Sequence, residues 1–132
     1  EKPDSMIINI EGVNKNFSLK ELKEKLVIIT KGQKITYIPD CSGIPENFSK
    51  IIKCAKESDY FFCEACFLEK DKNLAKNRGH LTANQAGVLA REAGAKFCRI
   101  FHFSPRYKTC EDKLYQEVEK AFKNKNIQQT DE

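Results

Sequence analysis

The sequence predicts an α/β fold in which helices pack on a mixed β-sheet. Short apolar runs alternate with helical patterns, in the order strand, helix, hairpin, helix, strand, helix, strand, helix. Of the 132 residues, 40% are hydrophobic and 32% are charged, which is an ordinary globular composition. No internal repeat and no linker-like change of composition divides the chain. We therefore expect one domain over residues 1–132.

The N-terminal region is expected to form a strand, a short helix and a hairpin. Residues 6–10 are apolar, and Ser18 with Glu21 has the spacing of a capping box that opens a helix of about two turns. Apolar runs at 26–30 and 35–38 flank the turn sequence K-G-Q-K. That arrangement predicts two paired strands.

The middle of the chain is expected to contribute a helix, a strand and a loop. Pro45 suits a first helical position, and an apolar stripe continues to about Lys56. Residues 60–67 (Y-F-F-C-E-A-C-F) form the most apolar strand. The polar and basic residues 70–78 are expected to form a surface loop.

The C-terminal region shows the clearest local signals. Thr82 and Gln85 have capping-box spacing, and Gly94 can end the helix that they open. Residues 97–101 are expected to form a strand that is buried on both faces. A last amphipathic helix follows, and the tail at 123–132 is expected to fray. The apolar positions of that helix are Leu114, Val118, Ala121 and Phe122.

Charge and cysteine content narrow the class of protein. The net charge of +4 is compatible with a phosphate-bearing partner, but it is far below that of a basic nucleic-acid arm. No run of about 18 apolar residues predicts a membrane span, and no secretory leader opens the chain. We expect a reducing, cytoplasmic setting in which the six cysteines mostly pack in the core. A metal or redox role for Cys63 and Cys66 remains the alternative.

Four polar residues occur where a strand ends or where polarity is costly. Asp40 follows the strand at 35–38, Glu64 lies inside an apolar strand, His80 precedes a helix, and His102 ends a strand. If these strands run parallel, Asp40, His80 and His102 converge on one crevice with Glu64 behind them. Carboxylates and imidazoles are ligands of zinc, and a histidine steered by a carboxylate is a general acid.

Each of the four also has a purely structural explanation. Asp40 suits a turn, Glu64 suits a paired core carboxylate, His80 suits a loop, and His102 suits a core position beside aromatic residues. Spacing by itself does not decide between these explanations and a metal site.

Within the stretch 31–107, the segment H-L-T-A-N-Q-A-G-V-L-A-R-E-A-G-A-K-F-C-R-I-F-H-F-S-P-R-Y is similar to the C-terminal segment of a known family. That family is ribonuclease Z, the tRNA 3′-processing endonuclease of the metallo-β-lactamase fold. Upstream, K-G-Q-K-I-T-Y-I-P-D-C resembles its strand ending in Gly-Asp-Thr, and F-F-C-E-A-C-F resembles its His-Glu-Ala-Thr strand. The resemblance implies half of an αββα sandwich.

The resemblance also implies roles for the site residues. Asp40 corresponds to an aspartate that bridges two zinc ions, and His102 to a ligand of one of them. His80, oriented by Glu64, corresponds to the proton donor to the leaving group. Two further residues, Ser104 and Arg106, lie where a phosphate could be contacted, although a conformational role for Arg106 remains open. The implied reaction is zinc-dependent phosphodiester hydrolysis, with precursor tRNA as the RNA partner.

The sequence departs from the family pattern in ways that affect this expectation. The His-x-His-x-Asp-His cluster is absent, and Pro39, Cys41 and Cys66 replace the usual Gly and two Thr. A catalytic zinc usually has about three protein ligands, so two cannot hold two ions well. We therefore expect an N-terminal half supplied elsewhere, or self-association through an uncovered sheet face, and an inactive chain by itself. The alternatives are a metallo-β-lactamase-fold hydrolase of a small ester or phosphodiester, and a non-catalytic RNA-binding or dimerisation module.

Overall fold

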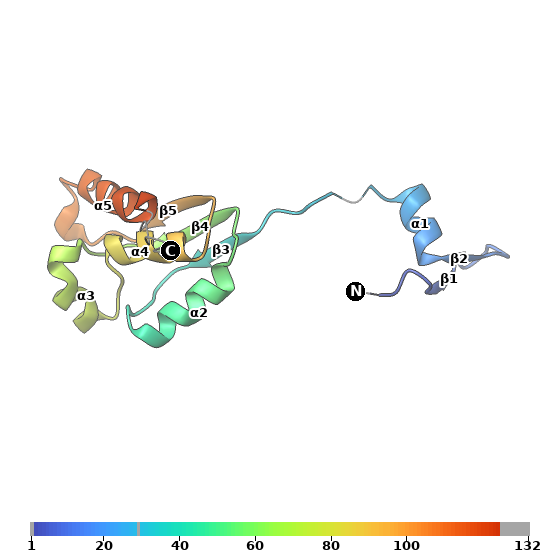
Figure 1. Ribbon diagram of the computed structural model, residues 1–132, viewed down its shortest axis with the longest axis horizontal. Coiled ribbons are helices and arrows are strands. Elements are labelled where there is room, and N and C mark those ends of the chain that lie inside the picture. The colour runs from blue at the N-terminus through green and yellow to red at the C-terminus, as the bar shows by residue number, and fades with distance from the viewer. Residues whose placement is uncertain (1, 29, 125–132) are drawn as a thin grey trace, which may run out of the picture. The chain divides into compact units, whose positions relative to one another are not determined.

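The computed structural model describes residues 2–28 and 30–124 of the chain (Figure 1). Contacts within the chain divide it into two compact units, at 1–32 and 33–132. Each unit is described by itself below, and the expectation of one domain for the whole chain stays a prediction. The predicted frayed tail lies outside the described residues from position 125 onward.

The first unit contains a two-stranded antiparallel ladder and one helix. Strand β1 (Ile7–Asn9) pairs with β2 (Asn16–Ser18), and helix α1 (Leu19–Leu26) follows directly. The Ser18 side chain accepts a hydrogen bond from the Glu21 backbone N–H at 3.1 Å, so the predicted helix start is confirmed. None of the described residues of this unit is buried.

The predicted hairpin at 26–38 is wrong. The described residues between α1 and position 35 form no strand, and strand β3 (Ile35–Ile38) pairs instead with β4 (Tyr60–Glu64), in parallel. The Lys34 carbonyl accepts hydrogen bonds from the backbone N–H groups of Asp59 and Tyr60, which fixes the start of β3 beside β4. The apolar residues 26–28 do not form the predicted strand, because their side chains pack on no sheet.

The second unit contains a three-stranded parallel sheet in the order β3-β4-β5, with β5 at Phe97–Phe101. Two helices, α2 (Pro45–Ala55) and α4 (Ala83–Glu92), connect the strands and pack on one face of the sheet. That face carries the buried side chains Phe61, Cys63 and Ile100. The α/β architecture predicted from the sequence is confirmed for this unit.

Helix α5 (Asp112–Lys123) packs against α4, where Gly87 permits a close approach. A Cβ atom at Gly87 would lie 2.6 Å from the Val118 carbonyl oxygen and 2.7 Å from the Ala121 Cβ. The predicted apolar stripe of this helix is buried at Leu114, Val118 and Ala121. The prediction of a terminal amphipathic helix is therefore confirmed.

The other face of the sheet is open and aromatic. Tyr37 stacks on Phe101 with ring centroids 4.9 Å apart, and Tyr60 stacks on Phe97 at 5.4 Å. The side chains of Tyr37 and Phe97 are 60% and 57% exposed. The expectation that 97–101 is buried on both faces is wrong, because no described element covers this aromatic face.

The segment between β4 and α4 is more ordered than its composition suggests. The expected surface loop at 70–78 is wrong, because helix α3 (Lys72–Arg78) follows a short 3-10 turn at Glu69–Asp71. Ala75 anchors this helix in the core, and Gly79 ends it with a φ of 73°. Strand β4 also ends at Glu64 instead of continuing to position 67.

Helix α4 begins and ends as its sequence predicts. Thr82 and Gln85 form a complete capping box, with a side-chain to backbone hydrogen bond in each direction. Gly94 takes a φ of 66°, the left-handed conformation expected after the helix. Across the described part of the chain, the helices are too short and too polar to cross a membrane.

Candidate metal centre

The predicted site residues lie at one edge of the parallel sheet. Asp40 follows the end of β3, Glu64 is the last residue of β4, and His102 follows β5. His80 lies between α3 and α4, and its backbone N–H donates to the Ala75 carbonyl at 2.9 Å. Since all three strands run in the same direction, their carboxyl ends bring these four residues together.

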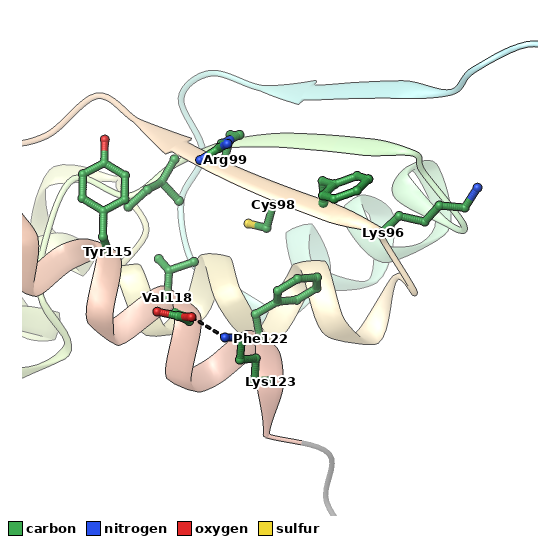
Figure 2. Close-up of a pocket in the computed structure, with 10 residues that line it drawn as sticks. Lys96, Cys98, Arg99, Tyr115, Val118, Phe122 and Lys123 are labelled. Carbon is green, nitrogen blue, oxygen red and sulfur yellow. Dashed lines mark hydrogen bonds and ion pairs between the residues drawn. The ribbon is translucent and has the colours of Figure 1, made fainter.

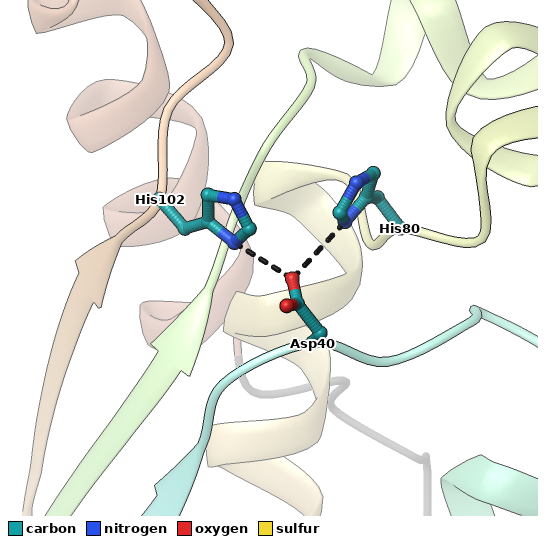
Figure 3. A group of neighbouring side chains, drawn as sticks. All are labelled: Asp40, His80 and His102. Atoms are coloured by element: carbon teal, nitrogen blue, oxygen red, sulfur yellow. Dashed lines mark ion pairs between the residues drawn. The ribbon is translucent and has the colours of Figure 1, made fainter.

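Asp40, His80 and His102 form what we call the outer cluster (Figure 3). One carboxylate oxygen of Asp40, Oδ1, lies 2.8 Å from His102 Nδ1 and 3.6 Å from His80 Nδ1. The two imidazole rings meet edge to face, with centroids 5.2 Å apart. One donor atom from each residue lies within 4.8 Å of the others.

Glu64 lies behind the outer cluster and is fully buried. Its Oε1 accepts a hydrogen bond from the Cys41 backbone N–H at 2.8 Å and lies 3.1 Å from His80 Nδ1. Its Oε2 has no hydrogen-bond partner among the described residues. A buried carboxylate with an unpaired oxygen costs free energy of folding. This atom therefore indicates that Glu64 has a role beyond packing.

His102 has a strained backbone. Its φ of 64° lies in the left-handed region that non-glycine residues rarely adopt. The backbone on either side is pinned, because the Phe101 carbonyl accepts from the Ala65 N–H and the Ser104 N–H donates to the Cys66 carbonyl. Strain of this kind is concentrated at functional sites, where the surrounding structure holds one side chain in a fixed direction.

A cavity of about 380 Å³ opens beside the two histidines. Ser104 lines it and Arg106 does not, and the predicted phosphate contacts of both residues stay predictions. The Arg106 guanidinium instead lies 3.5 Å from a carboxylate oxygen of Asp71. The lining residues are Cys66, Phe67, Arg78, His80, His102, Phe103, Ser104 and Pro105.

Sequence reasoning missed Arg78, which falls in the predicted surface loop at 70–78. In the structure Arg78 lines the cavity wall together with the buried Cys66, for which a metal or redox role was the alternative. The available signal for Arg78 was its position two residues before His80, at the C-terminal end of what proves to be a helix. Arg78 supplies a cation of the planar kind that suits phosphate oxygens.

The thiols around Glu64 are held in their neutral form. Burial, followed by the nearby charges of Glu64 and Asp40, raises the pKa of Cys66 to about 11. Burial and the Glu64 charge also raise the pKa of Cys41. Both raised pKa values indicate surroundings that are shielded from water and negatively charged. Such surroundings stabilise a cation and destabilise a thiolate.

The donor set of the outer cluster fits a zinc ion. One carboxylate and two imidazoles are ligands that zinc takes in catalytic sites, where it usually has three protein ligands and an open position. Their donor atoms are already within 4.8 Å of one another. Among the described residues, the outer cluster supplies three ligands for one ion if His80 is a ligand, and two, Asp40 and His102, if His80 keeps its proton. Either number is fewer than a second ion would also need.

A second cavity, of about 390 Å³, lies between β5 and α5 (Figure 2). Its wall is largely apolar, with Cys98, Val118 and Phe122, and its rim carries Lys96 and Lys123. It contains no group of metal-binding side chains among the described residues. In the described part of the chain, both groups of side chains that could hold a metal include residues at the strand ends.

The chain is similar in sequence to known ribonucleases. Ribonuclease Z of Streptomyces coelicolor is 34% identical over 113 residues, which cover 83% of this chain and 34% of that protein. Ribonuclease Z of Protochlamydia amoebophila is 38% identical over 118 residues, covering 80% and 38%. The chain thus spans about a third of the length of these curated relatives. No protein-family model matches it.

Two solved structures share the fold. The metallo-beta-lactamase fold protein YhfI of Bacillus subtilis superposes with a TM-score of 0.58 at 23% identity, over 68% of this chain and 34% of that one. Human tRNase Z, short form, superposes with a TM-score of 0.51 at 34% identity, over 58% and 29%. This chain therefore resembles ribonuclease Z in sequence, and it adopts part of the metallo-β-lactamase fold.

Proposed function

We propose that this chain supplies one wall of the active site of a zinc-dependent phosphodiester hydrolase of the ribonuclease Z type, which cleaves precursor tRNA at its 3′ end. The observation that carries the proposal is the position of Asp40 Oδ1, within 2.8 Å of His102 Nδ1 and 3.6 Å of His80 Nδ1. The similarity to two bacterial ribonucleases Z supports the choice of reaction.

Asp40 and His102 are the residues that would hold zinc. Bound there, zinc supplies a Lewis acid that stabilises charge on the phosphate oxygens. Both side chains are more exposed than that of Glu64, and they face a region where further ligands could approach. The family pattern would fill that region with the His-x-His-x-Asp-His segment.

His80 is the proposed proton donor to the leaving oxygen. Its Nδ1 lies 3.1 Å from the buried Glu64 Oε1, which fixes the ring and favours a proton on that nitrogen. The proton given to the leaving oxygen is then the second ring proton, the one on Nε2. Phe67 packs 6.1 Å from the imidazole, centroid to centroid, and helps to exclude water from this side.

Phosphate binding is assigned to the cavity beside the histidines. Ser104 lines it and offers a hydroxyl donor, and Arg78 lines it and offers a cation. Arg106 stays a predicted phosphate contact that would first have to leave Asp71. Its present ion pair equally supports a conformational role, in which Arg106 holds the turn after His102.

The open aromatic face is proposed as the seat of the complementary half of the sandwich. The stacked pairs Tyr37–Phe101 and Tyr60–Phe97 would be covered by a second sheet layer. The curated relatives are about three times as long as the matched segment, so they contain chain enough for that layer. Self-association of two copies through this face remains the alternative outcome of the reconstitution experiment described next.

The experiment reconstitutes the enzyme from two parts. The chain is mixed with zinc and with the unmatched remainder of the Protochlamydia amoebophila ribonuclease Z, and 3′ cleavage of precursor tRNA is measured. We expect neither part to turn over by itself and the mixture to be active. A mixture that forms a stable complex and binds zinc without cleaving a phosphodiester would reject the proposal.

The role of His80 is tested with two substrates. In the reconstituted enzyme, His80→Ala should lower tRNA cleavage by about 10²–10⁴. It should leave cleavage of bis(p-nitrophenyl) phosphate nearly unchanged, because nitrophenolate leaves without a proton. Equal losses on both substrates would assign His80 to the metal and reject it as the proton donor.

A non-catalytic RNA-binding module is the second candidate, because the aromatic face has the character of a base-stacking platform. Arg99 lies between Phe97 and Phe101 on β5 and is exposed, so a cation accompanies the rings. Salt-dependent binding of single-stranded RNA by the chain alone, lost in Tyr37→Ser and Phe97→Ser, would favour it. The free state of all six cysteines supports a reducing, cytoplasmic setting for either function.

A further inference from the structure

A second group of metal-binding atoms lies deeper than the outer cluster. Glu64, Cys66 and His80, which we call the inner cluster, each place one donor atom within 4.8 Å of the other two. Glu64 and Cys66 are buried, and His80 is partly buried. The inner cluster shares His80 with the outer cluster and replaces Asp40 and His102 by a thiol and a buried carboxylate.

The carboxylate of the inner cluster is only half satisfied. Glu64 Oε1 is occupied by the Cys41 N–H and His80, whereas Oε2 has no partner among the described residues. The side chain is fully buried, so bulk water does not supply the hydrogen bond that the unpaired oxygen lacks. A cation bound at this oxygen would remove the penalty.

The thiol is positioned by its own backbone. The Cys66 carbonyl accepts a hydrogen bond from the Ser104 N–H at 3.0 Å, which ties the residue to the turn after His102. The pKa of Cys66 is raised to about 11 by burial and by the charges of Glu64 and Asp40. A bound cation reverses that balance, since it stabilises the thiolate and displaces the thiol proton to solvent.

We propose that Glu64, Cys66 and His80 form a binding site for a thiophilic divalent cation, zinc or cadmium, that is separate from the catalytic pair Asp40 and His102. Thiolate selects such ions over magnesium or calcium. Bond lengths of roughly 2.0–2.3 Å place tetrahedral zinc ligands about 3.3–3.7 Å apart, so side-chain rotation closes the present spacing. Three protein donors leave one position for a fourth ligand.

Occupation of this site has a consequence for catalysis, which rests on the function proposed above. His80 cannot ligate an inner ion through the nitrogen beside Glu64 and keep the proton that Glu64 holds there. A thiophilic cation would therefore inhibit the hydrolase, because a ring ligated through Nδ1 cannot carry the second proton that the leaving oxygen receives from Nε2. The binding itself is independent of whether the chain takes part in hydrolysis.

The test is a cadmium titration of the full 132-residue chain, followed by the thiolate-to-cadmium charge-transfer absorbance. All proteins carry Cys54→Ser, because Cys54 is exposed and could bind the ion adventitiously. We expect saturation at one cation per chain. Cys66→Ser should abolish the band, whereas Cys110→Ser, His102→Ala and Asp40→Asn should retain it.

A second variant keeps the thiol and tests the carboxylate. Glu64→Gln should weaken cadmium binding by at least the roughly 10- to 100-fold that loss of an outer-shell partner costs. Circular dichroism confirms that each variant is folded before titration. A band that survives Cys66→Ser, or one that is equally strong in folded Glu64→Gln, overturns the proposal. A reconstituted complex that binds zinc but does not cleave a phosphodiester would reject the proposed function and leave this spectrum unchanged.

Discussion

Asp40 and His102 meet across the middle strand of the sheet, with Asp40 Oδ1 only 2.8 Å from His102 Nδ1. The two residues come from loops after β3 and β5, which are not neighbours in the sheet. Their contact depends on the parallel direction of all three strands and on the left-handed backbone of His102. The geometry of the outer cluster is therefore a property of the fold as a whole.

Removal of the Asp40 charge should weaken metal binding at the outer cluster. Asp40→Asn keeps the shape of the side chain but offers zinc a neutral oxygen, so we expect affinity to fall by at least about 10-fold. Isothermal titration with zinc measures this in a Cys66→Ser background, which removes the inner cluster. Glu119→Gln, a change on the exposed side of α5, is the matched control. Equal affinities in both variants would contradict a role for Asp40.

Loss of the hydrogen-bond acceptor at Glu64 should destabilise the fold. Glu64→Leu leaves the Cys41 N–H without its acceptor, and an unmade hydrogen bond in a partly buried place costs about 1–3 kcal/mol. Glu64→Gln retains an acceptor and should recover most of this loss. Urea unfolding measures both free energies of unfolding. A Leu variant as stable as the Gln variant would show that the contact contributes nothing.

An added methyl group at Gly87 should separate α4 from α5. The new Cβ would lie 2.6 Å from a backbone carbonyl oxygen of α5, so one helix must move. Overpacking of about 1–3 kcal/mol outweighs the gain of up to about 1 kcal/mol in helix propensity. Urea unfolding of Gly87→Ala gives the net loss. Gly32→Ala is the matched control, because no atom lies within 4 Å of its added Cβ.

The hydroxyl of Thr82 should be worth more than an ordinary helix cap. It accepts from the Gln85 N–H at 3.1 Å and donates to Glu69 at 2.6 Å, in a fully buried place. Thr82→Val keeps the volume and removes both bonds, so we expect a loss at the upper end of the roughly 0.5–2 kcal/mol for a cap. Thr82→Ser should restore most of it in thermal unfolding. A Ser variant no more stable than the Val variant would disprove this account.

Stability should fall in alkaline solution because buried thiols resist ionisation. Burial raises the pKa of Cys98 to about 12 and that of Cys66 to about 11, from an ordinary 9.0. Above about pH 9 the unfolded chain releases these protons and the folded chain does not, so the free energy of unfolding declines with rising pH. Their contribution is complete below about pH 9, and it is lost as the pH rises toward about 11 for Cys66 and about 12 for Cys98.

Urea unfolding between about pH 8 and pH 10.5 measures that decline. Cys98→Ser has no ionisable group in this range, so its slope with pH should be shallower than that of the parent chain. Gly32→Ala changes no ionisable group and should keep the parent slope. Identical slopes in all three proteins would show that the thiols are not responsible.

The parts of the fold with local signals were predictable from the sequence. Three elements are indicated by residues within one or two helical turns of each other. These are the capping box at Thr82 and Gln85, the apolar stripe in α5 and the proline that opens α2. The pairing of β3 was not predictable in this way. It depends on the Lys34 carbonyl meeting β4, a contact between residues distant in sequence.

The main residues of the candidate site were predictable from the sequence, whereas the residues around them were predicted only in part. Strand ends and costly polarity identify Asp40, Glu64, His80 and His102, and the structure brings all four together. Arg78 was not identified, because it ends a short helix. That helix is polar along most of its length, so its sequence resembles that of a loop. For Arg106 the sequence leaves a phosphate contact and a conformational role open, and its guanidinium lies beside Asp71.

A single oxygen atom, Oε1 of Glu64, joins the segment after β3 to the segment before α4 through the Cys41 amide and the His80 ring. Two loops fastened to one atom do not open separately. Hydrogen–deuterium exchange should thus show the amide protons of both loops with a common protection factor, and one substitution at that carboxylate should release both at the same rate. The active edge would then behave as one cooperative unit of local unfolding.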